Sequence, residues 1–190
     1  MRITVSGPPG SGTTSLARYL ARKYGLEFIS AGEVFRSLAR EHGMDLVEFG
    51  RLAESDPSVD QMIDARQKEI GEASEKIVVE GRLSGRMIKN ADLRIWLMAS
   101  LDCRAKRIAR RDGMDEEEAL AYTRDRQHSE ATRYLAYYNI DINDLSPYDI
   151  VLSSETFGVD ALGAIVDTAI ACLERQKGAG ASGSCISTPG

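Results

Sequence analysis

The glycine-rich stretch GPPGSGTTS, residues 7–15, constrains the fold of this chain more than any other segment. It follows the β-branched run RITVS (2–6), and it precedes Leu16 and Leu20, which begin an apolar pattern at helical spacing. A strand that enters a helix through such a turn directs several backbone N–H groups toward one point, where the helix N-terminus adds positive potential. The stretch therefore predicts a phosphate-binding loop at the carboxyl edge of a parallel sheet.

The loop matches the pattern G-x-x-x-x-G-K-[ST] at every fixed position but one, because Thr13 occupies the lysine position. Thr14 is expected to bind Mg²⁺ through its hydroxyl, whereas Thr13 is expected to present mainly its backbone N–H. Pro8 and Pro9 have no N–H, so the donors must follow them. The predicted ATP-binding residues are Gly7, Pro8, Pro9, Gly10, Ser11, Gly12, Thr13, Thr14 and Ser15.

Four more short apolar runs predict strands. They are EFIS (27–30), KIVVEG (76–81), LRIWLMA (93–99) and YDIVLS (148–153). Because they are apolar almost throughout, we expect a parallel sheet that helices cover on both faces. Five strands with helical crossovers predict a single doubly wound α/β domain.

That domain is expected to span residues 1–176, with its last helix beginning at about Val159. The Gly/Ser/Ala-rich tail, 177–190, has too little apolar content to pack and is expected to be disordered. Two helical excursions, 31–75 and 102–147, are longer than a crossover requires. We expect substrate-binding and lid elements in them.

Composition excludes several classes of function. A net charge of -5 over 190 residues argues against a protein that coats nucleic acid or an anionic membrane. Three cysteines without C-x-x-C spacing argue against a disulfide framework or a zinc site. The sequence opens on MRITVSG, with no leader pattern, and no apolar run approaches the ~18 residues that span a bilayer. We therefore expect a cytoplasmic protein, and a monomer.

Basic residues gather in two segments of this acidic chain, RAKRIARRDG (104–113) and TRDRQHSEATRY (123–134). Arg104, Arg107 and Arg111 recur at i, i+3 and i+7 and share one helix face. By itself such a face is more often solvated, but arginines from a closing lid can replace the charge that Thr13 lacks. Glu80, at the end of a predicted strand, could hold a magnesium-bound water or be a solvated acid.

Several segments together resemble archaeal-type cytidylate kinase, a small nucleoside monophosphate kinase with a P-loop. They are SGPPGSGTTS, SAGEVFRSLAREHGMDLVEFGRLAE, IDARQ, VVEGRLSG and YNIDINDLSPYDIVLSS. The resemblance covers residues 1 to about 173. It implies a P-loop NTPase fold with five strands in the order 2-3-1-4-5, a monophosphate-binding segment at about 31–75 and a lid at about 112–140. It also implies transfer of the γ-phosphate of ATP, with Mg²⁺, to CMP and dCMP.

The resemblance implies roles for individual arginines. Arg36 and Arg82 are similar to arginines that grip the phosphate of the acceptor, although each could also be a surface charge or a salt-bridge partner. The expected catalytic residues are Arg107 near the hinge and Arg124, Arg126 and Arg133 in the lid. At least one of these is expected to pair with Glu130. Thr13 is then a trait of the family, whereas Ser153 and Ser154 depart from its pattern.

The helix after Pro57 is expected to read the base. Asp64 and Arg66 could supply the acceptor and donor that distinguish cytosine from uracil. Spacing places Arg66 on the apolar stripe of this helix and Asp64 on the adjoining face. The alternative is that Arg66 lays its stem on the core and pairs with a neighbouring carboxylate.

Two other functions remain open. The first is a kinase of the same fold that acts on UMP, AMP or shikimate. The second is a nucleotide-sensing switch with little turnover, which would have no evident use for Arg36 and Arg82. A phosphate acceptor is already ionised near neutral pH, so no general base is needed and His42 and His128 are interpreted as surface residues.

Overall fold

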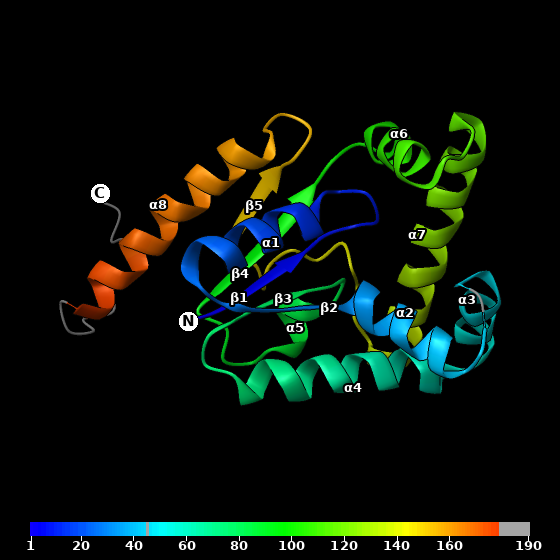
Figure 1. Ribbon diagram of the computed structural model, residues 1–190, viewed down its shortest axis with the longest axis horizontal. Helices are drawn as coiled ribbons and strands as arrows, with labels where there is room; N and C mark the ends of the chain where they lie inside the picture. The colour runs from blue at the N-terminus through cyan, green and yellow to red at the C-terminus, as the bar shows by residue number, and fades with distance from the viewer. Residues whose placement is uncertain (45, 179–190) are drawn as a thin grey trace, which may run out of the picture.

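The computed structural model describes residues 1–44 and 46–178. Figure 1 shows a central sheet with helices on both of its faces. The elements are β1 (Arg2–Ser6), α1 (Thr13–Tyr24), β2 (Glu27–Ser30), α2 (Ala31–Glu41), α3 (Leu46–Ser55), α4 (Pro57–Ala73), β3 (Ile77–Glu80), α5 (Ser84–Met87), β4 (Leu93–Met98), α6 (Leu101–Asp112), α7 (Glu116–Tyr138), β5 (Ile150–Ser153) and α8 (Val159–Gly178).

The sheet has five parallel strands in the order β2-β3-β1-β4-β5. The predicted fold class and strand order are therefore confirmed. β5 is shorter than predicted, because Tyr148 turns back to bond Leu145 and packs its ring on Trp96. The loop after β1 and the loop after β3 lie next to each other at the carboxyl edge of the sheet.

Alternation along the strands gives each face of the sheet its own apolar layer. On one face, Val5 and Val78 pack with Leu16 of α1 and Val166 of α8. On the other face, Val79 packs with Ile88 and with other residues near α4. Two covered faces explain why the strands are apolar almost throughout.

Helices α2, α3 and α4 enclose a second, smaller hydrophobic cluster. Phe49 is fully buried there, with Phe35 edge-on at 5.0 Å between ring centroids, and Val59 and Ile63 of α4 complete the cluster. This group of helices corresponds to the segment 31–75, and α7 lies within the segment 112–140. Figure 1 shows α7 running from α6 toward α3.

The last helix extends farther than predicted. It continues to Gly178, so residues 177 and 178 of the expected tail are helical, and Lys177 pairs with Asp92 at the start of β4. The rest of that tail, 179–190, lies outside the described residues. Within the described part of the chain, no helix is both long enough and apolar enough to cross a membrane.

Candidate active site

The loop between β1 and α1 has the backbone that its glycines predict. Gly10 (φ 81°) and Gly12 (φ 85°) are in the left-handed region, and Ser11 N–H bonds Pro8 O at 3.1 Å to close the turn. A Cβ on Gly10 would lie 2.7 Å from the carbonyl oxygen of Arg104, so a side chain is excluded there. The Ser11 hydroxyl is buried and bonds no other described atom, so it is free to bond a ligand.

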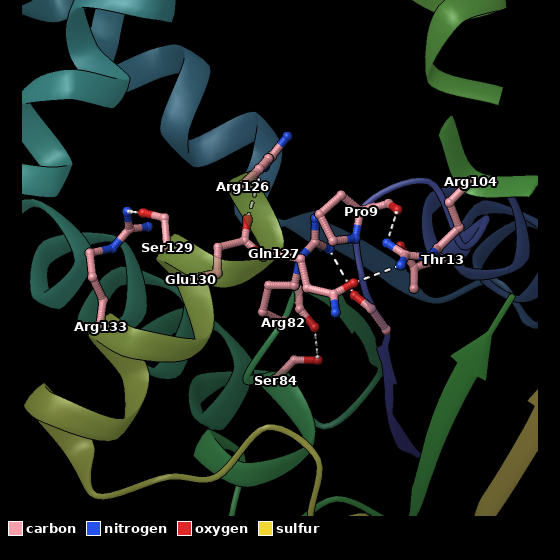
Figure 2. A network of polar contacts seen from close by, with 12 residues as sticks. Pro9, Thr13, Arg82, Ser84, Arg104, Arg126, Gln127, Ser129, Glu130 and Arg133 are labelled. Carbon is pink, nitrogen blue, oxygen red and sulfur yellow. Dashed lines mark hydrogen bonds and ion pairs between the residues drawn. The ribbon is translucent and has the colours of Figure 1, made fainter. Parts of the chain in front are cut away.

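Three arginines bond the carbonyl oxygens of the loop. Arg82 donates to Gly7 O at 2.9 Å, Arg104 to Pro9 O at 3.1 Å and Arg107 to Gly10 O at 3.4 Å. Figure 2 shows the Arg104 contact with Pro9. These side chains come from α6 and from the turn after β3, so two separate segments fix the shape of the loop.

Thr13 does more than present a backbone N–H, which corrects the expectation from the sequence. Its hydroxyl donates to Oε1 of Glu80 at 2.5 Å, and the Ser30 hydroxyl donates to Oε2 at 2.5 Å. Gln67 of α4 donates to the carbonyl oxygen of Glu80 at 2.7 Å. Glu80 is only 5% exposed, so the alternative of a solvated acid is wrong.

The loop region is chemically suited to a magnesium ion that arrives with a nucleotide. No cluster of three or more His, Cys, Asp or Glu side chains that could hold a metal occurs among the described residues. Mg²⁺ commonly takes only one or two protein ligands and completes its shell with phosphate oxygens and water. Two groups fit this pattern: the partly exposed Thr14 and the carboxylate of Glu80. That carboxylate accepts hydrogen bonds from two hydroxyl groups and forms no ion pair with a described cation.

Glu130 of α7 lies between two arginines from different segments. It accepts from Arg82 Nε at 2.8 Å and from Arg126 Nε at 2.9 Å, and it is 6% exposed. Burial opposes its ionisation, but the two guanidinium groups hold the pKa of Glu130 below its usual value. The expectation that a lid arginine pairs with Glu130 is confirmed for Arg126 (Figure 2).

The remaining predicted arginines have different surroundings. Arg107 donates to the hydroxyl (2.9 Å) and to the carbonyl oxygen (2.7 Å) of Ser154, so one departure from the family pattern contacts the site directly. Arg133 pairs with Asp60 of α4 at 2.8 Å. Arg36 and Arg124 are exposed and form no ion pair with another described residue.

Helix α4 is oriented differently from the prediction. Arg66 is not on a buried stripe: its side chain is 60% exposed and pairs with Glu69 at 3.1 Å. Asp64 instead faces α7 and accepts from the Tyr138 hydroxyl at 2.7 Å. Burial, with a smaller contribution from Asp60, raises the pKa of Asp64 to about 6 in spite of that hydrogen bond.

A small pocket opens beside the loop, with a volume of about 140 Å³. Its lining is mostly apolar and combines the start of α1 with the end of β5 and the start of α8. The lining residues are Gly12, Ser15, Arg107, Ser154, Phe157, Gly158, Val159 and Leu162. The pocket and the loop are adjacent, as the base and the phosphates of one nucleotide would require.

Sequence reasoning missed several residues of this network. Arg104, Gln127 and Tyr138 join α6 and α7 to the loop and to α4. Of these three residues, the sequence pattern pointed only to Arg104, which shares a helix face with Arg107. The contact of Ser30 was not predicted, because its partner Glu80 lies 50 residues away along the chain. The contact of Gln67 was not predicted either, because its acceptor is the backbone carbonyl oxygen of Glu80, which no sequence pattern marks.

Known proteins resemble this chain in sequence and in fold. Residues 2–156 match the cytidylate kinase-like family. The cytidylate kinase of Methanoculleus marisnigri is 79% identical over 179 residues, which cover 94% of this chain and 99% of that protein. The cytidylate kinase of Methanoregula boonei is 62% identical over 92% of this chain and 97% of that protein.

Among solved structures, shikimate kinase from Acinetobacter baumannii has the same fold, with a TM-score of 0.60 and 14% sequence identity over 90% of this chain and 93% of that one. A protein from Eubacterium ventriosum aligns with a TM-score of 0.67 and 20% identity, over 90% of this chain and 98% of that one. The matched residues, 2–156, make up most of the chain and include the loop, Arg82, Arg104 and Arg107. The chain belongs to the cytidylate kinase-like family.

Proposed function

We propose that this protein transfers the γ-phosphoryl group of ATP to CMP and dCMP, with Mg²⁺ bound to the donor. One observation carries the proposal: arginines from separate segments converge on the phosphate loop and on the adjacent Glu130. The curated relatives named cytidylate kinase support the choice of acceptor.

Phosphoryl transfer needs positioning and charge neutralisation more than it needs acid–base chemistry. The loop N–H groups after Pro9 would hold the donor phosphates, and Arg82 and Arg126 would approach the transferred group. Arg124 and Arg133 would act from the same lid helix, and Arg107 from its hinge. Bound magnesium would neutralise phosphate charge, held by Thr14 directly and by Glu80 through water.

The acceptor is proposed to bind on the side of α2 and α4. Arg36 is exposed and forms no ion pair with a described residue, and Arg82 borders the loop, so both are suited to the phosphate of a monophosphate. We assign the reading of the base to Asp64. Arg66, which the sequence favoured beside it, is exposed and paired with Glu69.

The donor base is proposed to occupy the pocket beside the loop. Arg107 and Phe157 border this pocket, and their flat groups can stack on an aromatic base. We further propose that the protein acts as a monomer in the cytoplasm, and size-exclusion chromatography with light scattering tests the first of these two points.

A coupled assay of ADP release tests the proposed function. Purified protein is given ATP and Mg²⁺ with CMP, dCMP, UMP, AMP or shikimate, and also without an acceptor. CMP and dCMP should give the highest kcat/KM. ADP release that does not depend on any acceptor would overturn the kinase proposal, whereas a preference for UMP, AMP or shikimate would correct only the acceptor.

A further inference from the structure

Arg104 is a buried cation on the far side of the phosphate loop. It is 4% exposed, and its guanidinium donates to Ala99 O at 3.1 Å, to Pro9 O at 3.1 Å and to Oε1 of Gln127 at 2.6 Å. Figure 2 shows Arg104 between the loop and α7. All three acceptors are neutral, so its charge has no direct counterion in these contacts.

The surrounding charges do not balance that cation. Glu130 is the carboxylate whose charge acts on Arg104, and it is already shared by Arg82 and Arg126. The other carboxylate at the loop, Glu80, is held by the hydroxyls of Thr13 and Ser30. Burial, and then the neighbouring Arg82, lower the pKa of Arg104. A buried charge without a partner is costly, so this arrangement leaves a surplus of positive charge that a bound polyphosphate would offset.

The position of Arg104 gives its charge a route to the phosphate side of the loop. Pro9 C=O and Gly10 N–H are the two ends of one planar peptide group. A guanidinium bonded to the oxygen polarises the group and makes the N–H at the other end a stronger donor. This N–H bonds no acceptor among the described residues, whereas the next one, on Ser11, is used by Pro8 O.

The contact between Arg104 and the loop is also fixed in distance. Gly10 lies against the Arg104 backbone so closely that an added Cβ would be 2.7 Å from its carbonyl oxygen. Only a glycine therefore fits between the loop and the α6 backbone, and the three hydrogen bonds oppose movement of the guanidinium away from the loop. Through Gln127 the same guanidinium is joined to α7, which carries Arg126 and Glu130.

We propose that Arg104 is a positioning residue for the phosphate donor: it supplies, from behind the loop and through the Pro9–Gly10 peptide, the positive charge that is absent at the Thr13 position. The contact with Gln127 ties this charge to the lid helix. The inference rests on the proposed function, because it requires that the loop binds the phosphates of ATP.

The test measures the binding of each substrate separately, by isothermal titration calorimetry with Mg²⁺–ATP and with CMP. Arg104→Gln removes the charge, Arg104→Lys keeps it with fewer donors, and Arg110→Gln removes an exposed charge from the same helix as a control. We expect Arg104→Gln to raise the Kd for ATP at least tenfold while the Kd for CMP changes less than twofold. Arg104→Lys should raise the Kd for ATP by a factor between two and ten, and Arg110→Gln should change neither.

An unchanged Kd for ATP in Arg104→Gln, or equal weakening of ATP and CMP, would overturn the inference. If Arg104→Gln does not fold, Arg104→Lys decides by the same criterion, since a selective loss of ATP binding supports the inference and an equal or absent loss overturns it. Wild-type protein that binds no ATP would instead refute the proposed function. The two failures are therefore distinguishable.

Discussion

The arginines at the phosphate loop and the arginine between α4 and α7 differ in the groups that they bond. At the phosphate loop, Arg104 and Arg107 bond backbone carbonyls and, in other directions, neutral side chains. Between α4 and α7, Arg133 is paired with the carboxylate of Asp60. The charges of Arg104 and Arg107 are therefore left for an anion, whereas the charge of Arg133 is already neutralised by a carboxylate of the protein.

This difference has a consequence for each substrate. A donor can add its phosphates to the loop without displacing a carboxylate partner of Arg104 or Arg107, because the contacts of these arginines are with neutral groups. An acceptor that is read by α4 has to share or replace contacts such as Tyr138 with Asp64. We therefore expect substitutions at the loop to change turnover strongly and substitutions at the α4–α7 contact to change selectivity and stability.

Thr14→Ala should have the largest effect, and it tests whether the phosphate loop controls turnover more than the α4–α7 contact does. Loss of one preorganised group that acts on the transition state lowers turnover by about a hundredfold or more. We expect kcat for CMP to fall by this order in steady-state assays, while the free energy of unfolding changes by less than about 0.5 kcal/mol. Thr14→Ser, which keeps the hydroxyl, is the control, and a loss as large in that variant would contradict a role of the hydroxyl in holding magnesium.

Thr13→Val tests a loop residue whose side chain donates to a carboxylate, as Arg133 does between α4 and α7. Without the Thr13 hydroxyl, the buried Glu80 keeps the donation from Ser30 but loses one donor at its carboxylate. An unsatisfied buried acceptor costs about 1–3 kcal/mol, so urea denaturation should show a loss of that size, which Thr13→Ser restores. Turnover should fall far less than in Thr14→Ala, and equal, large losses of turnover in the two variants would refute this division of roles.

The sequence predicted the fold because its signals are local. β-branched runs, the glycine positions of the loop and the apolar periods each act within a few residues, and those elements are where they were expected. The strand order came from resemblance. Side-chain partners could not be predicted in the same way: Arg133 meets Asp60 across 73 residues, and Tyr138 meets Asp64 across 74.

The same reason explains two arginines whose contacts the sequence did not predict. The spacing of Arg104 places it on a helix face that by itself is more often solvated. One of its acceptors is a backbone carbonyl oxygen of the loop, and the amino-acid sequence does not show which backbone atoms a side chain will bond. Arg66 follows Ile63 at helical spacing, but α4 is rotated so that Asp60 and Gln67 are buried. The polar face of α4 is turned inward because α7 and the sheet supply its hydrogen-bonding partners.

Asp64→Asn tests the carboxylate at the α4–α7 end. The pKa of Asp64 is raised to about 6 in the folded protein, above its ordinary value of 3.8, mainly by burial. The folded state therefore binds more protons than the unfolded state between these values, and stability from this group is lost as the pH rises through about 6. Asn removes that loss, so in urea denaturation the variant should exceed the wild type by about 2–3 kcal/mol at pH 7.5, and the difference should fall below about 1 kcal/mol near pH 4. The same difference at both pH values would show that ionisation of Asp64 is not its cause.

Asp64→Ala tests the reading of the base. Loss of one hydrogen bond that discriminates between two bases corresponds to about a tenfold change in selectivity. We expect the ratio of kcat/KM for CMP to that for UMP to fall by about this factor, with a smaller change in kcat for CMP. A ratio equal to that of the wild type would place the recognition of the base elsewhere.

Arg66→Ala should have the smallest effect, and it is the matched contrast to Asp64 two residues away on the same helix. The Arg66 side chain is 60% exposed, and its one ion-pair partner among the described residues is Glu69, itself 70% exposed, so solvent screens the pair. Exposed pairs of this kind on a helix contribute about 0.3–0.5 kcal/mol, and we expect a loss of stability no larger than that. Selectivity for CMP over UMP should stay within twofold of the wild type, because the guanidinium lies outside the buried contact that holds Asp64 against Tyr138. A fall in selectivity that equals that of Asp64→Ala would mean that Arg66 turns inward when the acceptor binds, and the contrast between the two faces of α4 would then fail.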